Sequence, residues 1–280
     1  RCPGQHVRPH HRVGGDEAGQ LADLAALGLV WDQDVVRQSE RLPLYRAALQ
    51  RLTDSGLVYP CFCTRREIRQ EIAGISSAPH EHLPHGAYPG ICRETDAGRR
   101  REQQEAGRVP ALRLRTHGEV RVVQDRLAGR FSGGVDDFIL ARADGTPAYN
   151  LAVVVDDADQ GVDQVVRGDD LLAGTPRQVL LADLLGLPVP EYWHVPLVLD
   201  GQGRRIAKRA GAVTLADLTD QGWTVPEVLS VLAGTLGLAA PGERIDLARL
   251  VDRFDPGLVP ADPVVWPDVL ARAAQRRRDR

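Results

Sequence analysis

The sequence has almost no lysine and no methionine. Of its 35 lysine and arginine side chains only Lys208 is a lysine, and methionine is absent from all 280 residues. Arginine replaces lysine wherever a positive charge alone is needed, so a surviving lysine is a candidate for work that arginine cannot do. Lysine offers a compact, flexible point charge, suited for example to a phosphate, whereas arginine offers a planar fork. Lys208 is therefore either a functional residue or a chance survivor in a basic loop.

Other features are scarce as well, and each scarcity excludes a class of protein. No apolar run approaches the roughly 20 residues that a bilayer-spanning helix needs. The net charge of −3 excludes a generally basic protein that coats nucleic acid, although local arginine clusters can still contact phosphates. Neither a G-x-G-x-x-G fingerprint nor a G-x-x-x-x-G-K-[ST] loop is present, which argues against dinucleotide enzymes and P-loop nucleotidases. We expect a cytoplasmic, monomeric protein with no membrane partner.

Cysteines are too few for a disulfide scaffold of this size. The chain has four of them, namely Cys2, Cys61, Cys63 and Cys92. The last three lie in a segment rich in histidine, proline and glycine, where clustered thiols indicate a metal. Tetrahedral zinc needs a fourth ligand. The nearby candidates are Tyr88, His80, His82 and His85. The alternative is three free cysteines in a core, but closely spaced ligands suit a small site that cannot otherwise fold.

Most of the chain alternates between helix and strand patterns. The continuous apolar run Leu151–Val155 predicts a strand buried on both faces. Thr175-Pro176 predicts the capping box of a helix that ends near Gly186. A further strand over Tyr192–Leu199 completes a parallel crossover unit. Beyond Thr214 the pattern predicts three helices, over Leu215–Gln221, Pro226–Leu236 and Leu247–Phe254.

Tyr149 and Arg167 are candidates for a binding site. Tyr149 comes just before the apolar run, and Arg167 follows a pair of valines. In an open α/β sheet, ligands bind beyond the carboxyl ends of parallel strands. An arginine at that position can hold a carboxylate with two hydrogen bonds. The alternative is a surface ion pair between Arg167 and Asp156 or Asp157.

Three long stretches, in this order and spacing, resemble the catalytic domain of glutamyl-tRNA synthetases, which are class I aminoacyl-tRNA synthetases. They are DGTPAYNLAVVVDD, VVRGDDLL and HVPLVLDGQGRRIAKR. The CFC and YPGIC segments move the resemblance toward the short paralogue, the glutamyl-queuosine tRNA(Asp) synthetases, which lack the anticodon-binding domain. The resemblance covers residues 21–214 well and the C-terminal helices loosely.

The resemblance implies a Rossmann-like parallel α/β sheet with a zinc-bearing insertion and a C-terminal helical subdomain. It places the catalytic domain at 21–214, the insertion at 61–116 and the helical subdomain at 215–280. Residues 1–20 have neither helical nor strand periodicity. The HIGH-type ATP-binding motif, the first strand and the crossover with which the family begins are not recognisable there. We expect an anomalous segment from a truncated or altered start, and a chain that activates glutamate poorly for that reason.

The resemblance also implies a reaction and its residues. The reaction is activation of glutamate by ATP with Mg²⁺, followed by transfer to the queuosine base of tRNA(Asp). Lys208 matches the catalytic lysine of the family's KMSKS loop, which stabilises charge developing on the α-phosphate. Tyr149 and Arg167 match residues that contact glutamate. The residues that match the zinc ligands are Cys61, Cys63, Tyr88 and Cys92.

Two other functions stay open at this point. One is a glutamyl-tRNA synthetase fragment that charges tRNA(Glu), and the other is a zinc-dependent tRNA-binding remnant without adenylation activity. Glutamate-dependent exchange between ATP and pyrophosphate separates the enzymes from the remnant. The choice between tRNA(Asp) and tRNA(Glu) separates the two enzymes.

Overall fold

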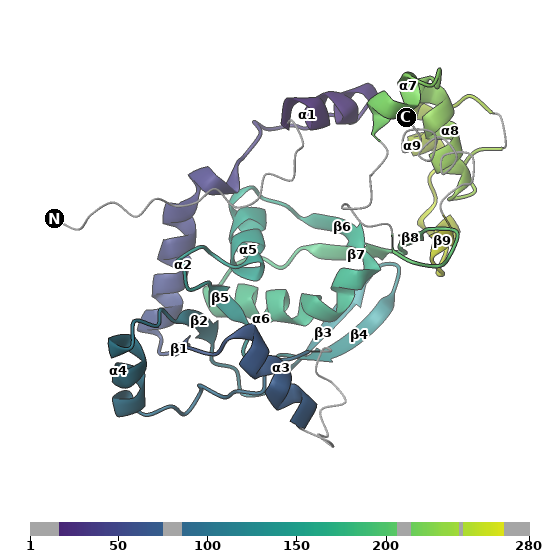
Figure 1. Ribbon diagram of the computed structural model, residues 1–280. Coiled ribbons are helices and arrows are strands. Elements are labelled where there is room, and N and C mark those ends of the chain that lie inside the picture. Colours follow the sequence, from purple (N-terminus) through teal and green to yellow (C-terminus); the bar gives the residue numbers. More distant parts are fainter. Residues whose placement is uncertain (1–16, 75–85, 206–213, 241–242, 266–280) are drawn as a thin grey trace. The chain divides into compact units, whose positions relative to one another are not determined.

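The chain divides into two compact units in the computed structural model (Figure 1). The larger is Val35–Pro196, and the smaller combines Arg1–Asp34 with Leu197–Arg280. The structure describes residues 17–74, 86–205, 214–240 and 243–265. Within those ranges no helix is both long enough and apolar enough to cross a membrane.

The larger unit holds two sheets and the helices packed against them. Its helices are α2 (Leu42–Asp54), α3 (Arg65–Gly74), α4 (Ala97–Glu105), α5 (Tyr149–Asp159) and α6 (Thr175–Leu185), with the 3-10 helices η1 (Gln38–Glu40) and η2 (Asp169–Gly174). Its strands are β1 (Val58–Cys61), β2 (Ala111–Leu114), β3 (Val120–Asp125), β4 (Gly129–Gly134), β5 (Ile139–Ala141), β6 (Gln164–Gly168) and β7 (Glu191–Val195).

The larger sheet is mixed, so the prediction of a parallel sheet is wrong in part. Its strand order is β4-β3-β7-β6, and β7 pairs parallel with both β3 and β6. The β3–β4 hairpin adds an antiparallel edge. A short tight turn joins these two strands, and such a connection allows only antiparallel pairing. The smaller sheet, β1-β2-β5, is antiparallel throughout.

The apolar run Leu151–Val155 is helical, which corrects the strand predicted there. It lies inside α5, and most of its side chains are buried. α5 packs against α2, α6 and β5, so it is covered on several sides. A helix covered in this way shows the same continuous apolar run as a buried strand. The parallel crossover is present, but it runs from β6 through α6 to β7.

The main core lies around α2, α5 and α6, where Leu151, Leu180 and Leu181 are at most 1% exposed. A buried carboxylate, Asp156 of α5, stands at its edge. Tyr45 of α2 donates to it at 2.7 Å, and Arg41 donates through Nε at 2.7 Å. These bonds tie α2 to α5, because an ionised buried group must keep its partners.

The start of α6 also differs from the prediction, although its end does not. Gly174 is the N-cap, and the Thr175 hydroxyl donates to the carbonyl of Leu171 instead of forming a capping box. Pro176 stands in the first turn, as expected. Gly186 ends the helix with φ at +61°, a left-handed conformation that favours glycine.

The smaller unit is helical with one short parallel strand pair. Its elements are α1 (Glu17–Ala26), β8 (Val198–Leu199), α7 (Leu215–Thr219), α8 (Val225–Gly234), α9 (Leu247–Arg253), η4 (Pro256–Leu258) and β9 (Val264–Val265). The three helices predicted beyond Thr214 are confirmed, with ends that differ by at most two residues. Thr214 and Thr224 begin two of them with capping boxes. The strand predicted over Tyr192–Leu199 is two strands, β7 and β8.

Candidate functional site

Arg167 lies near the carboxyl end of the parallel strand β6, opposite His194 of β7. Its Nε donates to His194 Nε2 at 3.0 Å, and its Nη2 donates to Thr175 Oγ1 at 2.7 Å. The guanidinium carbon lies 5.1 Å from the centre of the Tyr192 ring. Among the described residues neither Asp156 nor Asp157 forms an ion pair with Arg167. The surface ion pair considered from the sequence is therefore not what holds this arginine.

A fully buried pair stands behind Arg167. His194 Nδ1 lies 2.6 Å from Asp125 Oδ2, and both side chains are 0% exposed. Asp125 also accepts backbone N–H bonds from Leu127 and Ala128 at the turn after β3. Burial opposes ionisation, but the bonds from Ala128 and His194 outweigh it and lower the pKa of Asp125. The structure therefore places a buried carboxylate behind the histidine that contacts Arg167.

The sequence interpretation missed both members of this pair. His194 and Tyr192 are two residues apart in β7, and both are buried. Side chains two apart in a strand share a face, so the alternation in Tyr192-Trp193-His194 is the signal that could have placed His194 inside. No local signal pairs it with Asp125, which lies 69 residues earlier.

Tyr149 and Arg167 act on the same buried ring, that of Tyr192. Tyr149 is the first residue of α5 and is 52% exposed. Burial raises the pKa of Tyr192 to about 12; the Arg167 cation opposes this, while Asp157 and Tyr149 add to it. Arg167 lies over the Tyr192 ring, whereas among the described residues no hydrogen bond joins Tyr149 to Arg167, so a shared site for the two stays a prediction. Such donors suit a carboxylate ligand.

Lys208 lies outside the described residues, and its role stays a prediction. The chain that leads to it is described as far as Arg205, which bridges Leu199. Asp200 holds this turn by accepting the backbone N–H groups of Gln202 and Arg204, both at 2.9 Å. An aspartate that caps its own turn in this way is a common loop device.

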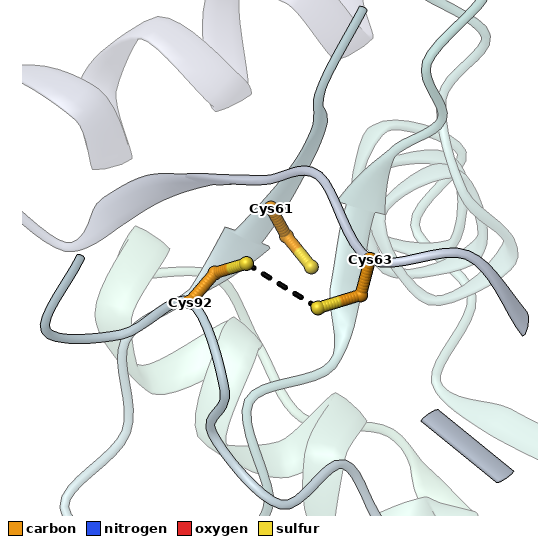
Figure 2. A group of neighbouring side chains, drawn as sticks. All are labelled: Cys61, Cys63 and Cys92. Carbon is orange, nitrogen blue, oxygen red and sulfur yellow. Dashed lines mark hydrogen bonds between the residues drawn. The ribbon is translucent and has the colours of Figure 1, made fainter. Parts of the chain in front are cut away.

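The structure brings Cys61, Cys63 and Cys92 together at the end of β1 (Figure 2). Their sulfur atoms lie within 4.8 Å of one another, with 3.3 Å between Cys63 and Cys92. Tyr88 Oη lies 3.4 Å from Cys61 Sγ and 3.5 Å from Cys63 Sγ. Zn–S bonds of about 2.3 Å in a tetrahedron put sulfurs roughly 3.8 Å apart, so the four atoms are spaced for zinc. The alternative ligands His80 and His82 lie outside the described residues, as does His85.

The cluster favours a thiolate. A hydrogen bond from Cys63, aided by Tyr88 and by the Arg113 cation, lowers the pKa of Cys61 to about 4 despite its burial. The same bond raises the pKa of Cys63, and burial raises the pKa of Tyr88. Metal ligands must lose their protons, so one thiolate is ready, and a divalent cation would be needed to ionise its neighbours.

Two consecutive aspartates fix the loop that carries Tyr88 and Cys92. Asp136 accepts the Tyr88 N–H at 2.8 Å and the Nε–H of Arg177, from α6, at 2.6 Å. Asp137 accepts the Tyr59 hydroxyl at 2.6 Å and pairs with Arg93. Burial opposes it, but these partners lower the pKa of Asp137. The loop that carries Tyr88 and Cys92 is thus held by two carboxylates that lie outside it.

Comparison with known proteins defines the class. The chain matches the family described as "tRNA synthetases class I (E and Q), catalytic domain" over residues 9–244, and it belongs to that family. It is 54% identical over 262 residues to the glutamyl-Q tRNA(Asp) synthetase of Nocardia farcinica, which covers 94% of this chain and 79% of that protein. It is 44% identical over 259 residues to the protein of the same name from Symbiobacterium thermophilum, covering 88% of this chain and 79% of that one. Its close relatives are thus enzymes of the tRNA ligase class.

Solved structures agree on the fold. A glutamate tRNA ligase from Elizabethkingia meningosepticum, in complex with its amino acid, superposes with a TM-score of 0.72 at 21% identity. The match covers 94% of this chain and 59% of the solved one. The chain therefore has the class I synthetase fold, a Rossmann-like mixed sheet with helices, and spans little more than half of that ligase.

Proposed function

We propose that this chain carries the catalytic domain of a glutamyl-Q tRNA(Asp) synthetase. In this proposal it activates glutamate with ATP and transfers it to the queuosine base of tRNA(Asp). Support comes from the 54% identity to the Nocardia farcinica protein. The structural observation that carries the proposal is Arg167, which is held on one edge by His194 and Thr175 and whose Nη1 has no partner among the described residues.

The residues divide the work as follows in this proposal. Arg167 binds a carboxylate of glutamate, and the exposed Tyr149 hydroxyl donates to the same substrate. A glutamate carboxylate oxygen bonds to the α-phosphorus of ATP, which enters with Mg²⁺, and pyrophosphate leaves. Lys208 stabilises the negative charge that develops on the α-phosphate. The glutamyl group then passes to queuosine, and AMP leaves.

Zinc has a separate, structural place in the proposal. Cys61, Cys63 and Cys92 hold it, with Tyr88 Oη as the fourth ligand. The bound ion would cross-link the end of β1 to the loop at residues 88–92. Three thiols and one phenol with matched spacing support this set.

The proposed function is tested with two acceptors, tRNA(Asp) with queuosine and tRNA(Asp) without it. We expect the protein to catalyse glutamate-dependent pyrophosphate exchange only slowly, because no HIGH-type motif is recognisable in residues 1–20, and to transfer labelled glutamate to queuosine-containing tRNA(Asp). tRNA(Asp) lacking queuosine is the matched control and should accept nothing. Transfer to both forms of tRNA(Asp) would contradict the assigned acceptor, and no exchange would contradict the enzyme itself.

A glutamyl-tRNA synthetase is the second candidate, and a more distant relative supports it. The chain is 40% identical over 243 residues to glutamate–tRNA ligase 1 of Alkalilimnicola ehrlichii, covering 84% of this chain and 49% of that protein. Charging of tRNA(Glu) in preference to tRNA(Asp) would select this candidate.

A further inference from the structure

The two edges of the Arg167 guanidinium are used differently. A guanidinium carries five N–H donors, which present one edge through Nε and Nη2 and another through Nη1 and Nη2. Nε donates to His194 and Nη2 to Thr175, so the first edge is taken up by the protein. Among the described residues the Nη1 donors have no partner. The edge formed by Nη1 and the second Nη2 hydrogen is therefore the one left for a ligand.

The hydrogen bonds also fix the tautomer of His194. Its Nδ1 faces the Asp125 carboxylate at 2.6 Å, and a carboxylate only accepts, so Nδ1 carries a proton. Its Nε2 faces the Nε–H of Arg167, which only donates, so Nε2 carries no hydrogen. The Thr175 hydroxyl also lies 3.2 Å from Nε2, but it donates to the carbonyl of Leu171. The geometry thus makes Nδ1 the donor to Asp125 and Nε2 the acceptor from Arg167.

We propose that Asp125, His194 and Thr175 are positioning residues that lock Arg167 so that only its Nη1/Nη2 edge meets the substrate carboxylate. Asp125 sets the tautomer of His194, His194 accepts from Nε, and Thr175 accepts from Nη2. This inference rests on the proposed function, because it assumes that Arg167 binds glutamate.

The Asp125–His194–Arg167 contacts contribute to ligand binding because they are buried. Asp125 and His194 are 0% exposed in their side chains, so water cannot replace either partner. Burying such a pair seldom adds net stability, so its retention needs another reason. A free arginine loses rotamer freedom when it binds, and holding it beforehand removes much of that loss. Fixing one edge also selects one approach direction for the carboxylate, which gives geometric specificity.

Two substitutions of His194 separate the effect of its hydrogen bond to Arg167 from the effect of its side-chain volume. His194→Gln places an amide oxygen near the Nε2 position and keeps an acceptor for Arg167, whereas His194→Leu keeps the volume and removes the acceptor. We expect His194→Leu to weaken glutamate binding by about 10- to 100-fold, the usual loss for a hydrogen bond to a charged group. His194→Gln should recover most of it, and the ATP KM should change little in either variant. Tyr45→Phe, which removes a buried hydroxyl contact to Asp156 in the same unit, is the stability control and should leave glutamate affinity unchanged.

The measurements are glutamate Kd by calorimetry, glutamate and ATP KM in pyrophosphate exchange, and ¹⁵N NMR of histidine-labelled protein. The His194 ring should show the Nδ1–H tautomer, and Asp125→Asn, whose amide can donate to Nδ1, should shift it toward Nε2–H. An unchanged glutamate Kd in Arg167→Ala would overturn the proposed role of Arg167. If Arg167→Ala weakens glutamate binding but His194→Leu does not, the role of Arg167 stands and the positioning inference is overturned. An Nε2–H or doubly protonated His194 ring in the unmodified protein would also overturn the positioning inference.

Discussion

Arg167 is only partly engaged by the protein, because His194 and Thr175 occupy one edge of its guanidinium. Arg167→Ala should therefore raise the glutamate KM by about 10- to 100-fold and the ATP KM much less, since a charge-assisted contact to one substrate is lost. Steady-state pyrophosphate exchange measures both constants. Arg126→Ala is the matched control, because Arg126 is 61% exposed and pairs with Glu191 on the same sheet. Equal increases for both substrates would indicate general damage to the fold.

Lys208 is the residue for which lysine and arginine should differ most. In a version of the protein that carries the family's HIGH-type motif, Lys208→Ala should slow glutamate activation on the order of 10²- to 10³-fold, as for other groups that stabilise transition-state charge. Lys208→Arg should also be slow, since a planar fork does not copy a point donor. Single-turnover adenylate formation is the measurement, with Tm as a check that folding is unaltered. Full activity of Lys208→Arg would make the lone lysine an accident of composition.

At the scale of elements, one glycine sets how closely β4 approaches α6. A Cβ added to Gly133 would lie 2.8 Å from Cγ of Pro176 and 3.0 Å from the Phe131 ring. Pro176 cannot rotate away, so Gly133→Ala should lower the free energy of unfolding by about 1 to 3 kcal/mol, as overpacking does. Urea unfolding measures this. Gly174→Ala, at the start of α6, meets nothing within 4 Å and should change stability far less.

The sequence predicted the elements whose signals are local. The helices beyond Thr214 and the end of α6 follow from caps and glycine, which act within one turn. α5 was mistaken for a strand because an apolar run covered on several sides has no period to read. Its eleven residues favour a helix by length, but its three consecutive valines favour a strand, and packing against α2 and α6 decided between them.

The cysteine cluster of the site could be predicted from the sequence, but the residues that orient the site could not. Cys61, Cys63 and Cys92 share a chemistry that their spacing reveals, and the structure brings them together. The residue pairs that orient the site have no comparable sequence signal, because their two members are far apart in the chain. His194 meets Asp125 across 69 residues, and the Tyr88 backbone meets Asp136 across 48. These contacts form only when the whole unit has folded.

At the scale of the whole molecule, we expect about one zinc per chain after reconstitution. Cys61→Ser, Cys63→Ser and Cys92→Ser should each lose most of the metal. Tyr88→Phe should retain it with lower affinity, because a phenol is a weaker ligand than a thiolate. Metal analysis with chelator competition makes the measurement, and Cys2→Ser is the matched control. A metal content near zero in reconstituted protein would contradict the site.

Acid should weaken the fold through its buried carboxylates. Asp125 and Asp137 have lowered pKa values in the folded state, while an unfolded aspartate titrates near about 3.9. Their stabilisation is therefore complete above about pH 4 and is lost as pH falls through the folded values. Asp157, whose pKa burial raises, contributes in the opposite direction. Urea unfolding between pH 7 and pH 3 should show the loss, and Asp137→Asn should be less stable at neutral pH but less sensitive to acid.

Asp136 and Asp137 make the segment of residues 61–116, which carries the three cysteines, unsuitable for transfer into another protein. The cysteines and Tyr88 fall within residues 61–116, a stretch that looks self-contained along the chain. Its shape, however, is set by two carboxylates that follow it and by Arg177 of α6, which braces one of them. A fragment cut at residues 61 and 116 would keep every proposed metal ligand but lose Asp136, Asp137 and Arg177, which position them. A fragment that preserves the cysteine cluster would therefore have to extend through α6.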